Sequence, residues 1–354
     1  MNDFEKRNAG FSGLAGLFNQ EPTPPDPFGL SSLFDALKQD SVRTRSSWND
    51  RFSHWETAES TTETKAIERA RDMVHSALRE NKWLANEGVV FGPQGSFTNR
   101  TNVRNEADID LRVQHPSLRI ECDANVNFQA AYQAGTYFDT GRSFAEIAQY
   151  MRTEISRDLK ACFGKGAVDD TGKKAIRVDG VDGSRGEVDV VPCFTLHHIR
   201  ASAGFVPFNT VQGVAILSTD GNWTMNYPDQ HIANGRLKRT TTGHQFKRIV
   251  RIVKRLQTDM EEYGVLEERV PSFLIECLVY LVKDHHFVYN EDRYDRVKRI
   301  LGRISEILSQ GGFLSPHLLL EINGVKPLFG GGQAWTLEKA QRFVNSALRH
   351  LGNR

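Results

Sequence analysis

The apolar residues of this chain follow two different periods, and this change of period constrains the fold more than any other feature. Between about residues 88 and 194, short runs such as 107–113 and 187–194 alternate apolar and polar residues, which is typical of β-strands. From about residue 215 onward, apolar residues recur every three or four positions, which is typical of amphipathic helices. The sequence therefore predicts an α+β fold, with a mixed sheet in the first lobe and helices in the second.

Capping residues mark where two of the helices begin. Ser60 with Glu63, and Ser143 with Glu146, have the spacing of a capping box, in which each side chain bonds the other residue's backbone N–H. The apolar periodicity predicts helices at about residues 61–78, 143–159, 244–260, 271–282, 297–308 and 337–351. The first two of these helices belong to the mixed lobe and the other four to the helical lobe.

The length of 354 residues suggests about two lobes. Residues 1–30 are rich in Gly, Asn and Pro, and we predict a flexible or loosely docked tail there. Residues 31–215 then form the mixed lobe, and residues 216–354 form the helical lobe. No internal repeat is found.

The composition argues against several classes of protein. A net charge of only +1 argues against an extended DNA-binding surface, although it allows a local basic stripe. The four cysteines are widely separated and none has the spacing of a zinc site, which fits a protein of the reducing cytoplasm. We find no signal peptide and no transmembrane run, so we expect a cytoplasmic chain that does not engage a membrane.

Three aspartates form the most informative pattern. Asp108 and Asp110 are two positions apart in a predicted strand, so their side chains share one face while Ile109 and Leu111 face the core. Neighbouring carboxylates repel each other, and a bound divalent cation removes that penalty. Asp189 lies in a second apolar strand, and if the two strands are neighbours the three carboxylates converge. Two metal ions about 3.5–4 Å apart could then activate an attacking hydroxyl and stabilise a pyrophosphate leaving group.

Gly95 and Ser96 follow another predicted strand. A residue without a side chain lets a phosphate approach backbone N–H groups, and a serine hydroxyl can bind a phosphate oxygen. Each motif is uninformative alone, because Gly-Ser pairs are common in turns and Asp-x-Asp pairs are usually solvated. Their order along the chain favours a metal-dependent nucleotide site: Gly-Ser after one strand, Asp-x-Asp in the next, and a lone Asp downstream.

The sequence around these motifs resembles a known family. Residues 91–103 and 106–111, which read Phe-Gly-Pro-Gln-Gly-Ser-Phe-Thr-Asn-Arg-Thr-Asn-Val and Glu-Ala-Asp-Ile-Asp-Leu, are similar to the active-site signature of the bacterial CD-NTases. These enzymes are relatives of cyclic GMP-AMP synthase and oligoadenylate synthase and act in CBASS antiphage defence. The similarity continues at residues 60–63, 187–192, 231–235, 246–251 and 271–276, so it extends from about residue 45 to the end of the chain.

The resemblance implies a polymerase β-like nucleotidyltransferase fold for the mixed lobe. It implies the synthesis of a cyclic di- or trinucleotide second messenger from ribonucleoside triphosphates, with Mg²⁺ (or Mn²⁺) as the cofactor. By the same resemblance, the metal-binding and catalytic residues are Asp108, Asp110 and Asp189. The nucleotide-binding residues are Gln94, Gly95, Ser96 and Lys247.

The role of Lys247 has an ordinary alternative. Lys247, Arg251 and Lys254 lie at i, i+4 and i+7 of a predicted helix and form one basic stripe. Such a stripe is usually a solvated helix face, whereas beside a triphosphate site Lys247 would be a phosphate ligand. Trp223 and Tyr227 present a similar choice, between stacking on a base and packing in a loop.

Two other functions remain open at the level of sequence. The same carboxylates would serve a synthase of linear oligonucleotides or another nucleotide-transfer enzyme, and only the family resemblance favours the cyclic product. A nucleotide-binding regulator without turnover is the third possibility, which the intact acidic triad argues against. The resemblance also implies a possible regulatory partner, either HORMA-type or a conjugation machinery. The C-terminal sequence Gly-Asn-Arg argues against conjugation.

Overall fold

The computed structural model describes residues 44–58, 60–103, 109–135, 137, 141–201, 208–314, 318–330 and 332–352. The chain divides into two compact units, Met1–Trp48 and Asn49–Arg354. The tail predicted for residues 1–30 lies outside the described residues. The second unit contains the predicted helical lobe and residues 49–215 of the predicted mixed lobe, so these parts pack into a single compact body.

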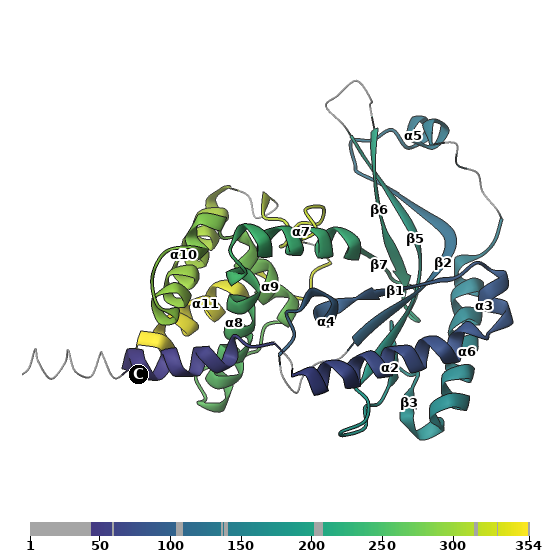
Figure 1. Cartoon of the computed structure of the whole chain (residues 1–354). Helices are drawn as coiled ribbons and strands as arrows, with labels where there is room; N and C mark the ends of the chain where they lie inside the picture. The colour runs from purple at the N-terminus through teal and green to yellow at the C-terminus, as the bar shows by residue number, and fades with distance from the viewer. Residues whose placement is uncertain are drawn as a thin grey trace, which may run out of the picture. The chain divides into compact units, whose positions relative to one another are not determined.

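A mixed sheet of seven strands in the described residues organises the first lobe (Figure 1). Its order is β1-β2-β5-β4-β3, with β6 added beside β5 and β7 beside β6. The pairing of β2 with β5 is parallel, and every other pairing is antiparallel. The strands are β1 Val90–Gln94, β2 Ile109–Cys122, β3 Val168–Asp169, β4 Ile176–Val178, β5 Val188–Ala201, β6 Phe208–Leu217 and β7 Trp223–Asn226.

The alternating strand pattern buries one face of the sheet. Ile109 and Leu111 of β2, and Val188 and Val190 of β5, are buried in a core shared with α2 (Thr61–Arg79) and α6 (Phe144–Phe163). These two long helices pack against that face of the sheet (Figure 1). The polar residues between the buried positions therefore point to the opposite face, as the sequence predicted.

Helix α2 begins at the predicted capping box. The Ser60 side chain accepts from the backbone N–H of Glu63, and the Glu63 carboxylate accepts from the backbone N–H of Ser60. Ser143 likewise caps α6 by accepting from the N–H of Glu146. The shorter helical elements of this lobe are α3 Lys82–Asn86, α4 Gly95–Asn99, α5 Phe128–Ala134 and the 3-10 turn η1 Lys165–Ala167.

The second lobe is helical from residue 228 onward, and it contains the four helices that the sequence predicted there. Helix α9 is apolar and deeply buried, which explains its nearly continuous run of hydrophobic residues. The elements are α7 Pro228–Thr241, α8 Gln245–Glu262, α9 Ser272–Leu281, η2 Asp284–Phe287, α10 Arg293–Leu314 and α11 Leu337–Gly352. In the part of the chain that the structure describes, no helix combines the length and apolar character that a bilayer crossing requires.

The sheet extends past the predicted boundary between residues 215 and 216. That boundary falls inside β6, and β7 pairs with β6 before the helices begin at Pro228. Strand β7 has only four residues, all of them half-buried, so it shows no alternation of buried and exposed positions that the sequence could reveal. Trp223 lies in this strand and not in a loop, and its ring contacts Phe144 of α6 and Phe194 of β5, which favours packing over base stacking for this side chain.

Candidate active site

Two of the three predicted aspartates lie side by side. Asp110 and Asp189 are register partners on the parallel strands β2 and β5, so their side chains share one face of the sheet. Asp108 lies outside the described residues. Within those residues no group of three or more His, Cys, Asp and Glu side chains gathers as a metal site. The predicted convergence of the aspartates required their two strands to be neighbours, and β2 and β5 are neighbours in the sheet.

An arginine lies beside this acidic pair. Arg177 of β4 is the register partner of Asp189. Its Nε atom lies 3.3 Å from Oε1 of Glu187 and 3.6 Å from Oδ1 of Asp189. The two carboxylates raise the pKa of Arg177. One flank of the acidic pair thus carries a fixed positive charge.

Gly95 allows the backbone to approach the acidic pair. Gln94, the last residue of β1, is the register partner of Asp110. Gly95 follows with a φ of +79°, and a Cβ at this position would lie 1.8 Å from Oδ2 of Asp110. Only a glycine fits here, because any side chain would collide with the carboxylate. Ser96 comes next, in the first turn of α4, and lines the same cavity.

The segment after α4 folds back on the start of that helix. The backbone N–H of Thr101 donates to the Ser96 carbonyl at 3.0 Å, and the side-chain amide of Asn99 donates to the Gly95 carbonyl at 2.9 Å. Arg100 makes the reversal in the left-handed conformation, with a φ of 54°. Residues 95–103 therefore form a tight unit next to Asp110.

A buried carboxylate joins this unit to the helical lobe. Oε1 of Glu276 in α9 accepts from Oγ1 of Thr101 at 2.8 Å and from Nζ of Lys254 at 2.7 Å. His231 of α7 places Nε2 3.5 Å from the other carboxylate oxygen. Burial acts to raise the pKa of Glu276, but the charges and hydrogen bonds of Lys254 and His231 outweigh it and lower the pKa to about 2. Glu276 therefore remains an anion and ties three elements together.

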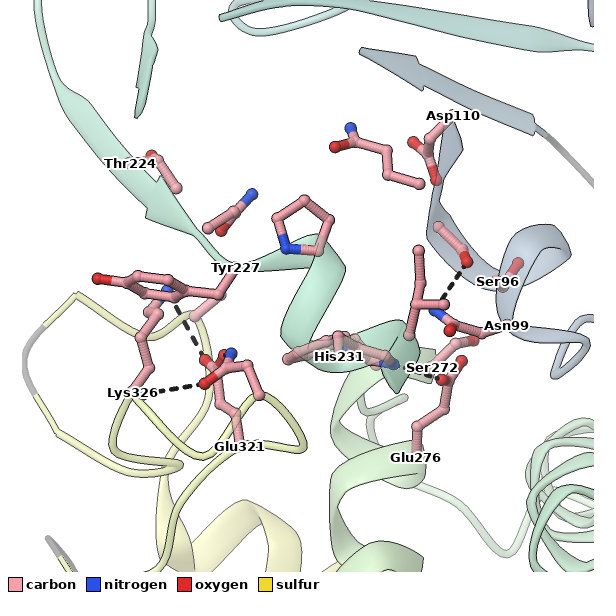
Figure 2. Close-up of a pocket in the computed structure, with 18 of the residues that line it drawn as sticks. Ser96, Asn99, Asp110, Thr224, Tyr227, His231, Ser272, Glu276, Glu321 and Lys326 are labelled. Carbon is pink, nitrogen blue, oxygen red and sulfur yellow. Dashed lines mark hydrogen bonds and ion pairs between the residues drawn. The ribbon is translucent and has the colours of Figure 1, made fainter. Parts of the chain in front are cut away.

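A cavity of about 650 Å³ opens between the sheet face and the helices, a volume that suits a nucleotide-sized ligand (Figure 2). Figure 2 shows Ser96 and Asp110 on one side of it and Tyr227, Glu321 and Lys326 on the other. From the first lobe, the residues that line it include Gln94, Gly95, Ser96, Asn102 and Asp110. From the helical lobe and the loop before α11, they include His231, Lys254, Phe273, Glu276 and Trp335.

Aromatic rings held by hydrogen bonds contribute to the far wall. The Tyr227 hydroxyl is bonded to Nδ1 of His198 at 2.7 Å, and Nε1 of Trp335 donates to the Leu328 carbonyl at 2.9 Å. Phe273 lies next to Trp335, with ring centroids 6.1 Å apart. Tyr227 lines the cavity but is only 3% exposed and packs in the hydrophobic core, so its stacking on a base stays a prediction. Trp335 was not identified from the sequence, because it lies in a loop without periodicity.

The basic stripe of α8 is not a solvated face. Lys247, Arg251 and Lys254 are only 5%, 7% and 5% exposed, so the ordinary interpretation of the stripe is wrong. Arg251 donates to the backbone carbonyls of Glu56 and Arg100, and Lys254 lines the cavity. Lys247 is buried about two turns before Lys254, and it is not among the lining residues of the cavity.

The surroundings of Lys247 disfavour its positive charge. Burial, first, and then the nearby guanidinium groups of Arg239, Arg100 and Arg236 lower its pKa to about 8, while Glu276 acts in the opposite direction. An anion bound at this place would relieve the repulsion among these cations. The burial and charge of Lys247 are thus compatible with the predicted contact to a phosphate.

Comparisons with known proteins point to one family. The sequence model of the cGAS/DncV-like nucleotidyltransferase C-terminal helical domain matches residues 233–352. The chain is 28% identical over 307 residues to the cyclic dipyrimidine nucleotide synthase CdnE of Legionella pneumophila, covering 86% of this chain and 98% of the relative. It is 27% identical over 310 residues to a cyclic dipurine nucleotide synthase of Elizabethkingia meningoseptica, covering 84% and 96%.

A solved structure gives the same result. The structure of Elizabethkingia meningoseptica CdnE cyclic dinucleotide synthase with GTP and Apcpp has a TM-score of 0.67 and 26% identity. The match covers 86% of this chain and 98% of that chain. Similarity over nearly the whole length of these relatives, in fold and in sequence, makes this chain a nucleotidyltransferase with a helical C-terminal lobe. More specifically, residues 233–352 match the C-terminal helical domain of the cGAS/DncV-like nucleotidyltransferases, and the similarity to CdnE synthases over 84–86% of the chain supports a bacterial CD-NTase. The predicted family, fold class and enzyme class are confirmed.

Proposed function

We propose that this enzyme joins ribonucleoside triphosphates into a cyclic di- or trinucleotide second messenger, with release of pyrophosphate, as part of an antiphage defence. The observation that supports the proposal most directly is the register pairing of Asp110 with Asp189, next to Gly95, at a cavity of about 650 Å³. The similar proteins from Legionella and Elizabethkingia are cyclic nucleotide synthases, which favours a cyclic product over a linear one.

The acidic pair suits a divalent cation. Two carboxylates on adjacent positions of a sheet face repel each other, and oxygen ligands of this kind are those that Mg²⁺ prefers. Asp108, Asp110 and Asp189 would hold Mg²⁺ (or Mn²⁺), which when bound neutralises phosphate charge and makes a sugar hydroxyl a better nucleophile. Asp110 and Asp189 would in addition fix the direction from which that hydroxyl approaches.

The triphosphate would lie along residues 94–96 and face α8. The absence of a side chain at Gly95 exposes the backbone, and the Ser96 hydroxyl can donate to a phosphate oxygen. Lys247, buried among three arginines, would supply positive charge toward the triphosphate. The base would lie toward the aromatic side of the cavity, where Tyr227 and Trp335 are held in fixed orientations.

The bases of the product are not assigned by similarity. A dipyrimidine synthase and a dipurine synthase are 28% and 27% identical to this chain, so resemblance favours neither class of base. The proposal also includes a regulatory partner, HORMA-type or a conjugation machinery, because the family resemblance implies one.

The test is to incubate the purified protein with ATP, GTP, CTP and UTP in the presence of Mg²⁺ or Mn²⁺ and to treat the products with phosphatase. We expect products that resist phosphatase, because a cyclic oligonucleotide has no terminal phosphate. Phosphatase-sensitive oligonucleotides would instead establish the linear synthase, and the absence of any product would establish the regulator.

The matched control is the double variant Asp110→Asn/Asp189→Asn. Amides remove the two charges but keep the size of the side chains, so the variant should fold and lose product formation by a factor of at least about 10³. A double variant that forms product at the wild-type rate would show that these carboxylates are not the catalytic site. Far-UV circular dichroism and melting temperature verify that the fold is intact.

A further inference from the structure

Asn102 is buried, yet its side chain makes no hydrogen bond within the part of the chain that the structure describes. The residue is 2% exposed and lines the cavity. Among the described residues, neither its amide nitrogen nor its amide oxygen has a hydrogen-bond partner. The large majority of buried side-chain polar atoms in proteins are hydrogen-bonded, because an unpaired buried amide loses its bonds to water without replacement. Such an exception at a cavity wall indicates a partner that arrives with the ligand.

The neighbours of Asn102 show that its position is fixed. Thr101 is bonded on one side to the Ser96 carbonyl and on the other to the Glu276 carboxylate. Val103, on the other side, is buried. The backbone around Asn102 is thus held in place before any ligand binds, so that the free amide needs little reorganisation to make a contact.

The chemistry of the amide narrows the choice of ligand group. A carboxamide is neutral and presents donors and an acceptor together, which matches a hydroxyl group better than it matches a phosphate. Asn102 follows Thr101, whose backbone N–H donates to the Ser96 carbonyl. Asn102 is therefore close to Ser96, which Figure 2 shows on the same side of the cavity as Asp110. In the proposed joining of ribonucleotides, a sugar hydroxyl has to reach the carboxylates of Asp110 and Asp189. A nucleobase would instead face the opposite, aromatic side.

We propose that Asn102 is a substrate-binding residue whose carboxamide hydrogen-bonds a ribose hydroxyl of a bound nucleotide. This inference rests on the proposed function, because it takes a ribonucleoside triphosphate as the ligand. It adds a residue that recognises the sugar, and so distinguishes ribonucleotides from deoxyribonucleotides.

The experiment measures the dissociation constants of wild type and of Asn102→Leu for a ribonucleoside triphosphate with Mg²⁺ and for its 2′-deoxy and 3′-deoxy forms. The probe is whichever of ATP, GTP, CTP and UTP binds wild type most tightly. We expect wild type to bind one deoxy form about tenfold more weakly than the ribonucleotide, since one hydrogen bond is lost. Asn102→Leu should bind the ribonucleotide about tenfold more weakly and show no further loss for that deoxy form.

A second readout separates binding from folding. Because the amide bonds none of the described residues, Asn102→Leu should melt at or above the wild-type temperature even though it binds nucleotide more weakly. If leucine overpacks the site and the variant does not fold, Asn102→Ala replaces it in the same measurements. The matched control is Asn81→Leu. That asparagine is also buried, but it bonds Leu84, Glu154 and Asp158, so its loss should lower the melting temperature and leave nucleotide binding unchanged.

Three outcomes would overturn the inference. In the first, Asn102→Leu and Asn102→Ala bind like wild type. In the second, the variants keep the full deoxy penalty and lose discrimination among bases, which would assign Asn102 to the base. In the third, wild type binds none of the four nucleotides, and then the proposed function fails as well. In the first two outcomes wild type binds nucleotide, so only the inference about Asn102 fails.

Discussion

At the scale of the residue, Gly95 couples the conformation of the backbone to the position of the Asp110 carboxylate, which we propose to be catalytic. Its φ of +79° and the 1.8 Å separation between a hypothetical Cβ and Oδ2 of Asp110 are two independent reasons for glycine. We expect Gly95→Ala to lose at least about a hundredfold in kcat/KM, because displacing a catalytic carboxylate by about an ångström has an effect of that order. The measurement is the rate of product formation from saturating and limiting nucleotide.

Gly88→Ala is the control that separates the effect of a positive φ from the effect of a contact with Asp110. Gly88 also has a positive φ, +70°, but a Cβ there would meet only Cγ of Pro116, at 3.9 Å. Both variants should lose about 1–2 kcal/mol of unfolding free energy through backbone strain. Only Gly95→Ala should lose activity. Equal activity in the two variants would show that the contact with Asp110 is not needed for catalysis.

The pKa of Lys247 gives a prediction of stability. Burial and neighbouring arginines lower this pKa to about 8 from an ordinary value of 10.5. The unfolded state therefore binds more protons than the folded state between these values, so stability contributed by this group rises with pH across this window. Below pH 8 the buried charge costs stability. Lys247→Met should thus unfold at higher urea concentration than wild type at pH 7, and the advantage should shrink as the pH rises from 8 to 10. A variant less stable than wild type at pH 7 would contradict this.

The same residue gives a prediction of activity. If Lys247 faces the triphosphate, Lys247→Met should lose about ten- to hundredfold in kcat/KM, the effect of one charge-assisted hydrogen bond of ~1.5–3 kcal/mol. Arg248→Met, an exposed position on the same helix, is the control and should stay within twofold. Lys254 cannot serve as a control, because it lines the cavity and is paired with Glu276. Activity of Lys247→Met within twofold of wild type would limit this lysine to a structural role.

At the scale of the element, Glu276 connects the loop after α4 to α7 and α8. Removing its charge leaves Lys254 buried without a counter-ion, so Glu276→Gln should lose about 3–5 kcal/mol of unfolding free energy at pH 7. Lys254→Met alone should also destabilise, and combining the two should recover part of the loss, since neither charge is then left alone. The exposed pair of Glu261 with Arg269 provides the control, Glu261→Gln, with a change below about 0.5 kcal/mol. Additive losses in the double variant would mean that the ion pair contributes no coupling.

The elements also show what sequence can and cannot predict. The apolar patterns and the serine caps predicted α2, α6, α8, α9, α10 and α11, because these signals come from residues close together in the sequence. The sequence could state only conditionally that Asp110 and Asp189 converge, since strand neighbourhood is set by long-range pairing. Of the two interpretations that the sequence left open for the basic stripe of α8, the solvated face was wrong, because burial there comes from other elements packed against the helix. The roles of Glu276 and Trp335 in the cavity depend on contacts across the lobes and carry no local signal.

At the scale of the whole molecule, hydrogen bonds connect the two lobes of the unit Asn49–Arg354. Arg251 is an example, because its guanidinium donates from α8 to the carbonyl of Glu56, before α2, and to the carbonyl of Arg100, after α4. Neither contact touches the cavity itself. Because these bonds cross between elements far apart in the sequence, opening one lobe exposes polar groups in the other. We therefore expect the lobes to unfold together.

This cooperativity can be tested with heat and with nucleotide. Differential scanning calorimetry should show one transition for the unit that holds both lobes, and a ribonucleoside triphosphate with Mg²⁺ should shift that transition upward as a whole, since the ligand binds only the folded state. Arg251→Met should lose about 2–4 kcal/mol, because it leaves two backbone carbonyls without their charged donor. Arg269→Met, which removes only an exposed ion pair, should change little. If nucleotide shifted one of two separate transitions and left the other in place, the lobes would be independent folding units, and the cavity between them would form only when ligand draws them together.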